Sequence, residues 1–115
     1  MKEFAVKFHL EDSAYMTALR LVAGAVCSAE DVDVDTSEDF KVCVTESAIL
    51  LKNCGFESAE FVFSTDGGVT LEAAGKGGKP HASENDFSLA LVSALVSDCK
   101  IDGRGGIIEK VTLKI

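Results

Sequence analysis

The chain has 115 residues, of which 47% are hydrophobic and 26% are charged, and its formal net charge is −8. This length predicts one domain over residues 1–115, and the composition is too apolar for intrinsic disorder. The acidic balance argues against nucleic acid or an anionic membrane as the main partner, because both require a concentrated basic surface. No apolar run approaches the ~20 residues of a membrane span, and no signal-peptide core follows the first methionine, so we expect a cytoplasmic protein.

Hydrophobic periodicity predicts eight elements, in the order strand–helix–helix–strand–strand–helix–strand–strand. The expected strands cover residues 2–10, 59–64, 69–73, 99–102 and 107–115, and the expected helices cover residues 13–27, residues 36–55 and a segment that starts near Ser83. Thr36, with Asp39 three positions later, predicts the cap of the second helix. An Asp-Gly turn at residues 66–67 predicts a hairpin, and alternation in the last strand groups Ile107 with Val111 and Leu113.

This order lacks the regular strand–helix alternation of a doubly wound fold. We therefore expect an α+β fold, namely a two-layer α/β sandwich. In this fold three helices pack on one face of a mixed, mainly antiparallel sheet of about five strands.

The sequence predicts no metal site. Its four cysteines are widely spaced and include no CxxC pair, whereas structural zinc requires short loops that each supply two ligands, so we expect reduced and mostly buried thiols. The acidic residues 31–35 resemble the start of an EF-hand loop. Thr36 stands where that loop needs glycine and Val42 where it needs glutamate, which indicates a solvated loop instead.

Two motifs have both a chemical and a structural interpretation. Glu46, flanked by small and apolar residues of the second predicted helix, is either a general base or an exposed helical carboxylate. The glycine-rich residues 75–79 suggest a phosphate loop but lack its Gly-Lys-Ser/Thr spacing, so a flexible turn is the alternative. His9 and His81 have no nucleophile in an elbow motif nearby, and the sequence gives no support for nucleophilic catalysis.

Two segments, residues 36–48 (TSEDFKVCVTESA) and residues 83–101 (SENDFSLALVSALVSDCKI), match one family in the order of its elements. They resemble the GHKL ATPase superfamily, and in particular the anti-sigma factor serine kinases of bacterial partner-switching systems. Residues 36–48 are similar to the family's N-box helix, and residues 83–101 to its second glycine box, third helix and next strand. Residues 15–29 resemble its first helix. The resemblance implies a nucleotide loop at Gly75 and Gly77, a catalytic base at Glu46, and ATP with Mg²⁺ as cofactors.

The chain departs from this pattern at the positions that would hold the nucleotide. Leu50 replaces the Mg²⁺-binding Asn, Ala73 replaces the adenine-binding Asp, and Asp86 stands where phosphates need bare N–H groups. The lid is shortened to residues 78–82. Loss of the Asn and Asp contacts alone removes roughly 3–5 kcal/mol, or about two to four orders of magnitude in affinity. We therefore expect the site to be vestigial, with no cofactor.

In the family the first helix contributes to the face that binds a sigma factor or an anti-sigma antagonist. Arg20 lies in that helix and resembles the family's partner-binding arginine; otherwise it is a solvated helical side chain. The sequence thus predicts a regulatory protein-binding domain without kinase activity. The alternatives are an ATP-dependent serine kinase with residual nucleotide binding, and a homodimeric subunit that pairs through its last strand or first helix.

Overall fold

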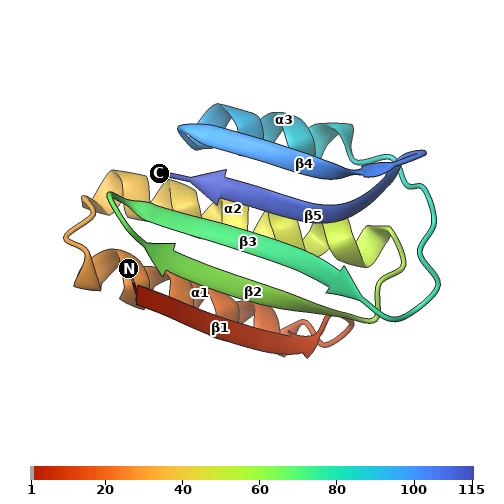
Figure 1. Ribbon diagram of the computed structural model, residues 1–115, viewed down its shortest axis with the longest axis horizontal. Coiled ribbons are helices and arrows are strands. Elements are labelled where there is room, and N and C mark those ends of the chain that lie inside the picture. Colours follow the sequence, from red (N-terminus) through yellow and green to blue (C-terminus); the bar gives the residue numbers. More distant parts are fainter. Residues whose placement is uncertain (1) are drawn as a thin grey trace.

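The computed structural model describes residues 2–115, which form a sheet with three helices on one of its faces (Figure 1). The elements in chain order are β1 (Lys2–His9), α1 (Ala14–Ala29), α2 (Val34–Asn53), β2 (Ser58–Thr65), β3 (Val69–Lys76), α3 (Asp86–Leu95), β4 (Asp98–Arg104) and β5 (Ile107–Lys114). The predicted two-layer α+β fold is confirmed. The third helix begins at Asp86, three residues later than expected.

The sheet has the strand order β1-β2-β3-β5-β4. All four neighbouring pairs within residues 2–115 are antiparallel, so the sheet has no parallel component. The predicted hairpin closes at residues 66–68, where the Asp66 N–H donates to the carbonyl of Gly68 at 3.2 Å. β5 lies between β3 and β4, which occupy both of its edges. The last strand is therefore not free to pair with a second copy, and β1 and β4 are the two edge strands.

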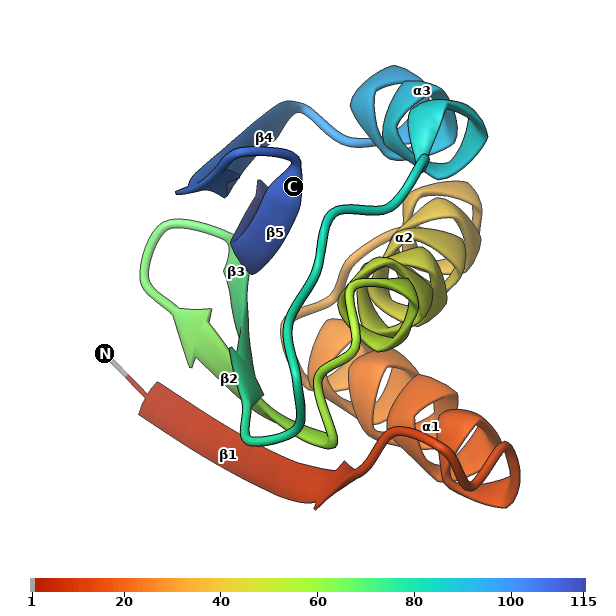
Figure 2. The same cartoon turned by 90° about the vertical axis from the view of Figure 1, so that its right-hand side faces the viewer.

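The core lies between the central strands and α2, and Figure 2 shows α2 between α1 and α3 over the sheet. The fully buried side chains of α2 include Phe40, Val44 and Leu51, and they pack toward Phe61 and Phe63 of β2. Phe40 and Phe63 meet edge to face with ring centroids 6.2 Å apart. This helix is apolar along its sheet-facing side because its hydrophobic residues recur at three- and four-residue spacing.

The start of α2 differs from the sequence prediction. Asp33, and not Thr36, is the N-cap residue, since its carboxylate accepts the N–H of Thr36 at 3.1 Å. This hydrogen bond lowers the pKa of Asp33. The helix consequently begins at Val34, two residues before the expected start, because a capping aspartate satisfies one of the free N–H groups of the first turn.

A register shift in the last hairpin changes which isoleucine is buried. Asp102 pairs with Lys110 and Gly103 pairs with Ile108, so Glu109 is an extra residue in β5. This β-bulge shifts the alternation by one, and Ile108 faces the core with only 8% of its surface exposed. Ile107, which simple alternation groups with Val111 and Leu113, is only half-buried, whereas those two residues are fully buried.

Three of the four cysteines are buried, and all four are free thiols, as expected. Burial raises the pKa of Cys43 to about 12, which keeps this thiol protonated and unreactive at neutral pH. Residues 2–115 contain no group of three or more His, Cys, Asp or Glu side chains placed to hold a metal ion. Within the same range, none of the helices has the length and apolar character needed to cross a bilayer.

Candidate functional site

Two regions on opposite sides of α2 contain the predicted site residues. The first, which we call the closed end, comprises the C-terminal half of α2, the start of α3, and the strap, residues 77–85, that connects β3 to α3. The second, the α1–α2 groove, is lined by Thr17, Arg20, Leu21, Glu38, Lys41 and Val42.

Glu46 lies on the α3 side of α2 and already has a hydrogen-bond partner. The hydroxyl of Ser88 donates to Glu46 Oε2 at 2.7 Å, and both side chains are half-buried. A carboxylate that acts as a base must reach the proton that it removes. Here Glu46 accepts the hydroxyl proton of Ser88, which belongs to α3 of the same chain. The hydrogen bond therefore links α2 to α3.

The two positions that the resemblance would assign to adenine and Mg²⁺ are part of the core. Leu50 on α2 and Ala73 on β3 are both fully buried and belong to one hydrophobic cluster. Aliphatic side chains supply neither the oxygen ligand that Mg²⁺ prefers nor an acceptor for an amino group. The space between α2 and β3 is therefore filled by apolar side chains at these two positions.

The glycines of the suspected nucleotide loop have local structural roles. Gly75 packs against the ring of Phe56, and an added Cβ would overlap this ring. Gly77 and Gly78 have φ angles of +65° and +71°, a backbone region that favours glycine. A Cβ on Gly78 would also collide with the carbonyl oxygen of Gly55. These residues form a tight turn against the end of α2.

The strap is attached to the end of α2 by backbone hydrogen bonds. The His81 N–H donates to the Cys54 carbonyl at 2.7 Å, and the Lys79 N–H donates to the Gly55 carbonyl at 3.2 Å. In Figure 2 the strap runs along this end of the molecule from β3 to α3, between the sheet and α2. The sequence predicted a short polar loop here but not its attachment, because backbone hydrogen bonds leave no residue pattern.

Side chains complete the attachment. Asn85, at the end of the strap, is only 6% exposed, and it accepts from Asn53 Nδ2 at 3.1 Å and donates to the buried Cys54 sulfur at 3.8 Å. The same sulfur accepts the Ile108 N–H at 3.4 Å. Cys54 thus joins α2, the strap and β5, a role that its apolar sequence context did not reveal.

A polar hollow remains on the outside of the closed end. It is lined by Asn53 and by residues 84–88, which include the exposed carboxylates of Glu84 and Asp86 and no basic side chain. Asp86 is the first residue of α3. Two carboxylates at this helix start oppose the binding of a polyphosphate, which would otherwise be attracted to the N–H groups there.

The α1–α2 groove, in contrast, has exposed side chains. Leu21 is 70% exposed and Val42 is 40% exposed, on facing helices, and the hollow between the helices measures about 270 Å³. Arg20 is exposed beside Leu21 and forms no ion pair with any residue in 2–115. Arginine is one of the residue types enriched at protein–protein interfaces, and the exposed apolar groups beside Arg20 could be buried by a partner.

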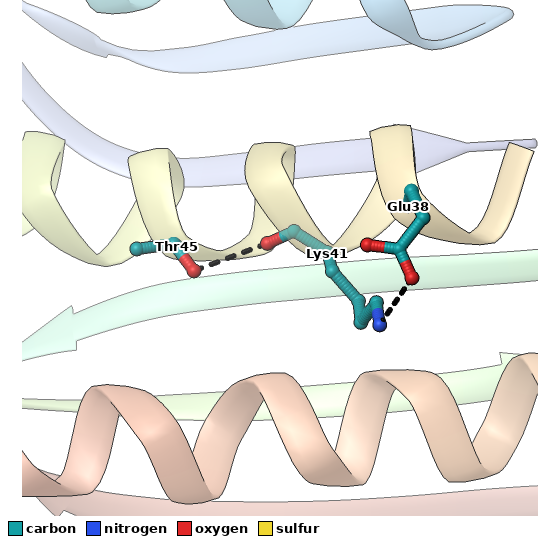
Figure 3. Close-up of polar contacts among 3 residues, drawn as sticks. All are labelled: Glu38, Lys41 and Thr45. Atoms are coloured by element: carbon teal, nitrogen blue, oxygen red, sulfur yellow. Dashed lines mark hydrogen bonds and ion pairs between the residues drawn. The ribbon is translucent and has the colours of Figure 1, made fainter. Parts of the chain in front are cut away.

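Lys41 lines this groove from the α2 side. Its side chain extends from α2 toward α1 and meets Glu38 at 2.7 Å, and Thr45 Oγ1 donates to the Lys41 carbonyl at 3.1 Å (Figure 3). Gly24 on α1 leaves room for the lysine stem, since a Cβ there would lie 3.4 Å from Lys41 Cδ. The ion pair with Glu38 balances the charge of Lys41, so Arg20 supplies the unpaired positive charge of the groove.

Comparison with known proteins gives no family for the chain: no protein-family model matches it, and no curated protein matches it in sequence.

Proposed function

We propose that this chain is a regulatory protein-binding domain similar to an anti-sigma factor, and that it neither binds ATP nor phosphorylates serine. The observation that carries the proposal is the contrast across α2. Residues of the chain fill the end where the resemblance would place a nucleotide, whereas the α1–α2 groove presents the unpaired Arg20 and exposed apolar groups.

The closed end argues against nucleotide binding through its packing and its charge. ATP would have to displace the buried side chains at positions 50 and 73 and break the two backbone hydrogen bonds of the strap. It would also bring phosphates close to Glu84 and Asp86. Each contact to a charged group that is lost removes about 1.5–3 kcal/mol, so micromolar binding would become millimolar or absent.

The groove supports a protein partner of defined chemistry. Such a partner would place an acidic side chain on Arg20 and an apolar side chain between Leu21 and Val42. A sigma factor or an anti-sigma antagonist is the class of partner that the resemblance implies. The groove suits a helix or a loop of the partner, because it lies between the two packed helices α1 and α2.

Calorimetric titration with Mg-ATP tests the nucleotide part of the proposal. We expect no binding at micromolar nucleotide and no transfer of phosphate to a serine-containing partner. Saturable micromolar binding would contradict the proposal and favour the alternative, an ATP-dependent serine kinase that uses Glu46 as its base. The charge-neutral variant Glu46→Gln would then identify the base, since it should retain binding and lose phosphate transfer.

The partner-binding part is tested with purified sigma factors and anti-sigma antagonists from the same genome. We expect one of them to bind the wild-type chain, and Arg20→Glu to weaken this binding about 100-fold with an unchanged melting temperature. Arg104→Glu is the matched control: Arg104 is 89% exposed in the β4–β5 hairpin, outside the groove, and its variant should bind normally. Equal loss of binding in both variants, or a lowered melting temperature for Arg20→Glu alone, would contradict a role for the groove.

A further inference from the structure

α3 lies at one end of the helical layer, beyond α2 (Figure 2), and it is apolar around most of its circumference. Its only polar residues are Asp86, Ser88 and Ser93, and its only buried residue is Val92. A surface helix normally turns a polar side toward solvent, and a helix that is apolar on all sides is normally covered. α3 packs on α2 and β4, so its outward side is left uncovered by the part of the chain that the structure describes.

The outward side of α3, which we call the α3 face, consists of Phe87, Ala90, Leu91 and Ala94. These residues are three or four positions apart and therefore lie on one side of the helix. Phe87 is 79% exposed, more than any other large hydrophobic residue within 2–115, while Ala90 and Ala94 are exposed and Leu91 is half-buried. An exposed apolar surface of this kind, when polar residues border it, marks an interaction site.

The charges that border the α3 face are negative at both ends of the helix. Glu84 and Asp86 are exposed at its start, and Asp98 is exposed three positions after its last residue. Residues 80–99 contain no lysine or arginine. The next lysine along the chain, Lys100, lies 3.9 Å from Asp102. The border of the face is therefore acidic, and it is complementary to positive charge.

We propose that the α3 face binds a basic amphipathic helix of another protein. The apolar side chains of that helix would pack on Phe87 and Leu91, and lysines or arginines near its two ends would reach Glu84 and Asp98. The ten residues of α3 span about 15 Å, so the basic residues of the partner would lie about ten to twelve positions apart. The α3 face is on the opposite side of α2 from the α1–α2 groove, so this partner would bind in addition to one in the groove.

The acidic border disfavours other occupants. An anionic membrane and a nucleic acid would both be repelled by Glu84, Asp86 and Asp98. A second copy of the chain would place these carboxylates beside its own, whether the two α3 helices were parallel or antiparallel, because both ends of the helix are acidic. A basic protein segment is the one occupant that gains from both the apolar face and its border.

Two synthetic helical peptides of about 18 residues test the proposal. Both carry leucines three and four positions apart along one side, and they differ only at their ends, where one has pairs of lysines and the other pairs of glutamates. Fluorescence anisotropy measures their affinity for the full chain. We expect the lysine peptide to bind at least about tenfold more tightly than the glutamate peptide, and to lose affinity when salt rises from about 50 to 300 mM. Equal affinities, or no binding of the lysine peptide at ~1 mM chain, would overturn the proposal.

A pair of apolar variants tests whether the peptide lies on the α3 face. Phe87→Ala should weaken binding of the lysine peptide about tenfold or more, because Phe87 is the largest apolar group of the face. Leu21→Ala is the matched control, since Leu21 is 70% exposed in the α1–α2 groove, and this variant should bind the peptide normally. Both side chains are exposed, so both variants should keep the melting temperature of the wild-type chain. Unchanged binding by Phe87→Ala would contradict the proposal.

Reversal of the border charges tests the electrostatic part. The double variant Glu84→Lys with Asp98→Lys should lose the lysine peptide and bind the glutamate peptide instead. The double variant Glu11→Lys with Glu30→Lys makes the same change of net charge at exposed positions next to the two ends of α1, and it should bind the lysine peptide as the wild-type chain does. Identical behaviour of the two double variants would show that only net charge matters and would overturn the proposal.

Two further measurements on Phe87→Ala examine the other occupants. Light scattering at about 100 µM should give the same mass for this variant and the wild-type chain, and neither should bind vesicles that contain phosphatidylserine. A mass that falls when Phe87 is removed would assign the α3 face to a second copy of the chain. Vesicle binding that depends on Phe87 would assign it to a membrane, and either result would overturn the proposal.

Discussion

α2 separates two regions that differ in whether their polar and charged side chains already have partners within the chain. Toward α3, Glu46 accepts from Ser88, Asn85 is held by Asn53 and Cys54, and the strap is bonded to the end of the helix. Toward α1, Arg20 has no ion-pair partner within residues 2–115, and Leu21 and Val42 are exposed. Groups that are satisfied inside the chain contribute to its stability, and groups that are left exposed are available to a partner.

The contrast predicts different results for substitutions in the two regions. Changes in the closed end should lower the free energy of unfolding, whereas changes in the groove should leave it unchanged and affect only binding. This difference can be measured by denaturant unfolding of each variant.

The largest effect is expected for Leu50→Asn, which restores the residue type that binds Mg²⁺ in the resembled family. Leu50 is fully buried among apolar residues, so the new amide would be buried without a partner. We expect the free energy of unfolding to fall by about 3–5 kcal/mol, with no gain of Mg-ATP binding. Denaturant unfolding and calorimetry measure the two quantities.

Leu50→Met is the control for this substitution. It keeps the volume and the apolar character of the side chain and should cost less than about 1.5 kcal/mol. A stable Leu50→Asn variant that binds Mg-ATP would mean that the closed end can open, and the contrast between the two regions would then fail.

A smaller effect is expected where the strap meets α2. Gly78→Ala introduces a Cβ that meets the Gly55 carbonyl oxygen at a residue with φ of +71°. Gly67→Ala has the same backbone strain, with φ of +72°, but no atom lies within 4 Å of the new Cβ. We expect a loss of about 1 kcal/mol for Gly67→Ala and about twice that or more for Gly78→Ala. Equal losses would indicate that the strap is not packed against α2.

The hydrogen bond between α2 and α3 should contribute less to the free energy of unfolding. Ser88→Ala removes the hydroxyl that donates to Glu46 and should lower the free energy of unfolding by about 1 kcal/mol. Ser93→Ala makes the same change at an exposed position of the same helix, so the two variants share any gain in helix propensity. Their difference in unfolding free energy measures the hydrogen bond, and the absence of a difference would mean that Glu46 is effectively free.

The fold could be predicted from the sequence because each element has a clear hydrophobic period and clear turn residues. The helical stripe that ends at Leu51 and the Asp-Gly turn at residues 66–67 placed the helices and hairpins in order. The start of α2 was wrong because Asp33 and Thr36 are both residue types that cap helices. Thr36 was chosen because Asp39 follows it three positions later, but in the structure Asp33 is the cap and Thr36 lies in the first turn.

The candidate site could be predicted only in part. Sequence reasoning selected Glu46 and Arg20, but the partner of Glu46 is Ser88, which lies 42 positions away and follows from how α3 packs. The role of Cys54 was likewise hidden, since its contacts with Asn85 and Ile108 depend on the path of the strap and on the bulge in β5. Contacts of this kind depend on tertiary packing and leave no local pattern in the sequence.

The smallest effect on stability, with a large effect on binding, is expected in the groove. Leu21→Ala shortens a side chain that is 70% exposed, so the free energy of unfolding should change by less than about 0.5 kcal/mol. Affinity for a partner that depends on Arg20 should fall about tenfold or more, because the partner would lose an apolar contact next to that charge. Phe87→Ala is the matched control: Phe87 is 79% exposed on α3, and its removal should change neither quantity. If both variants bound the partner equally well, the exposed apolar groups of α1 would have no special role, and the surface that binds the partner would have to lie outside the α1–α2 groove.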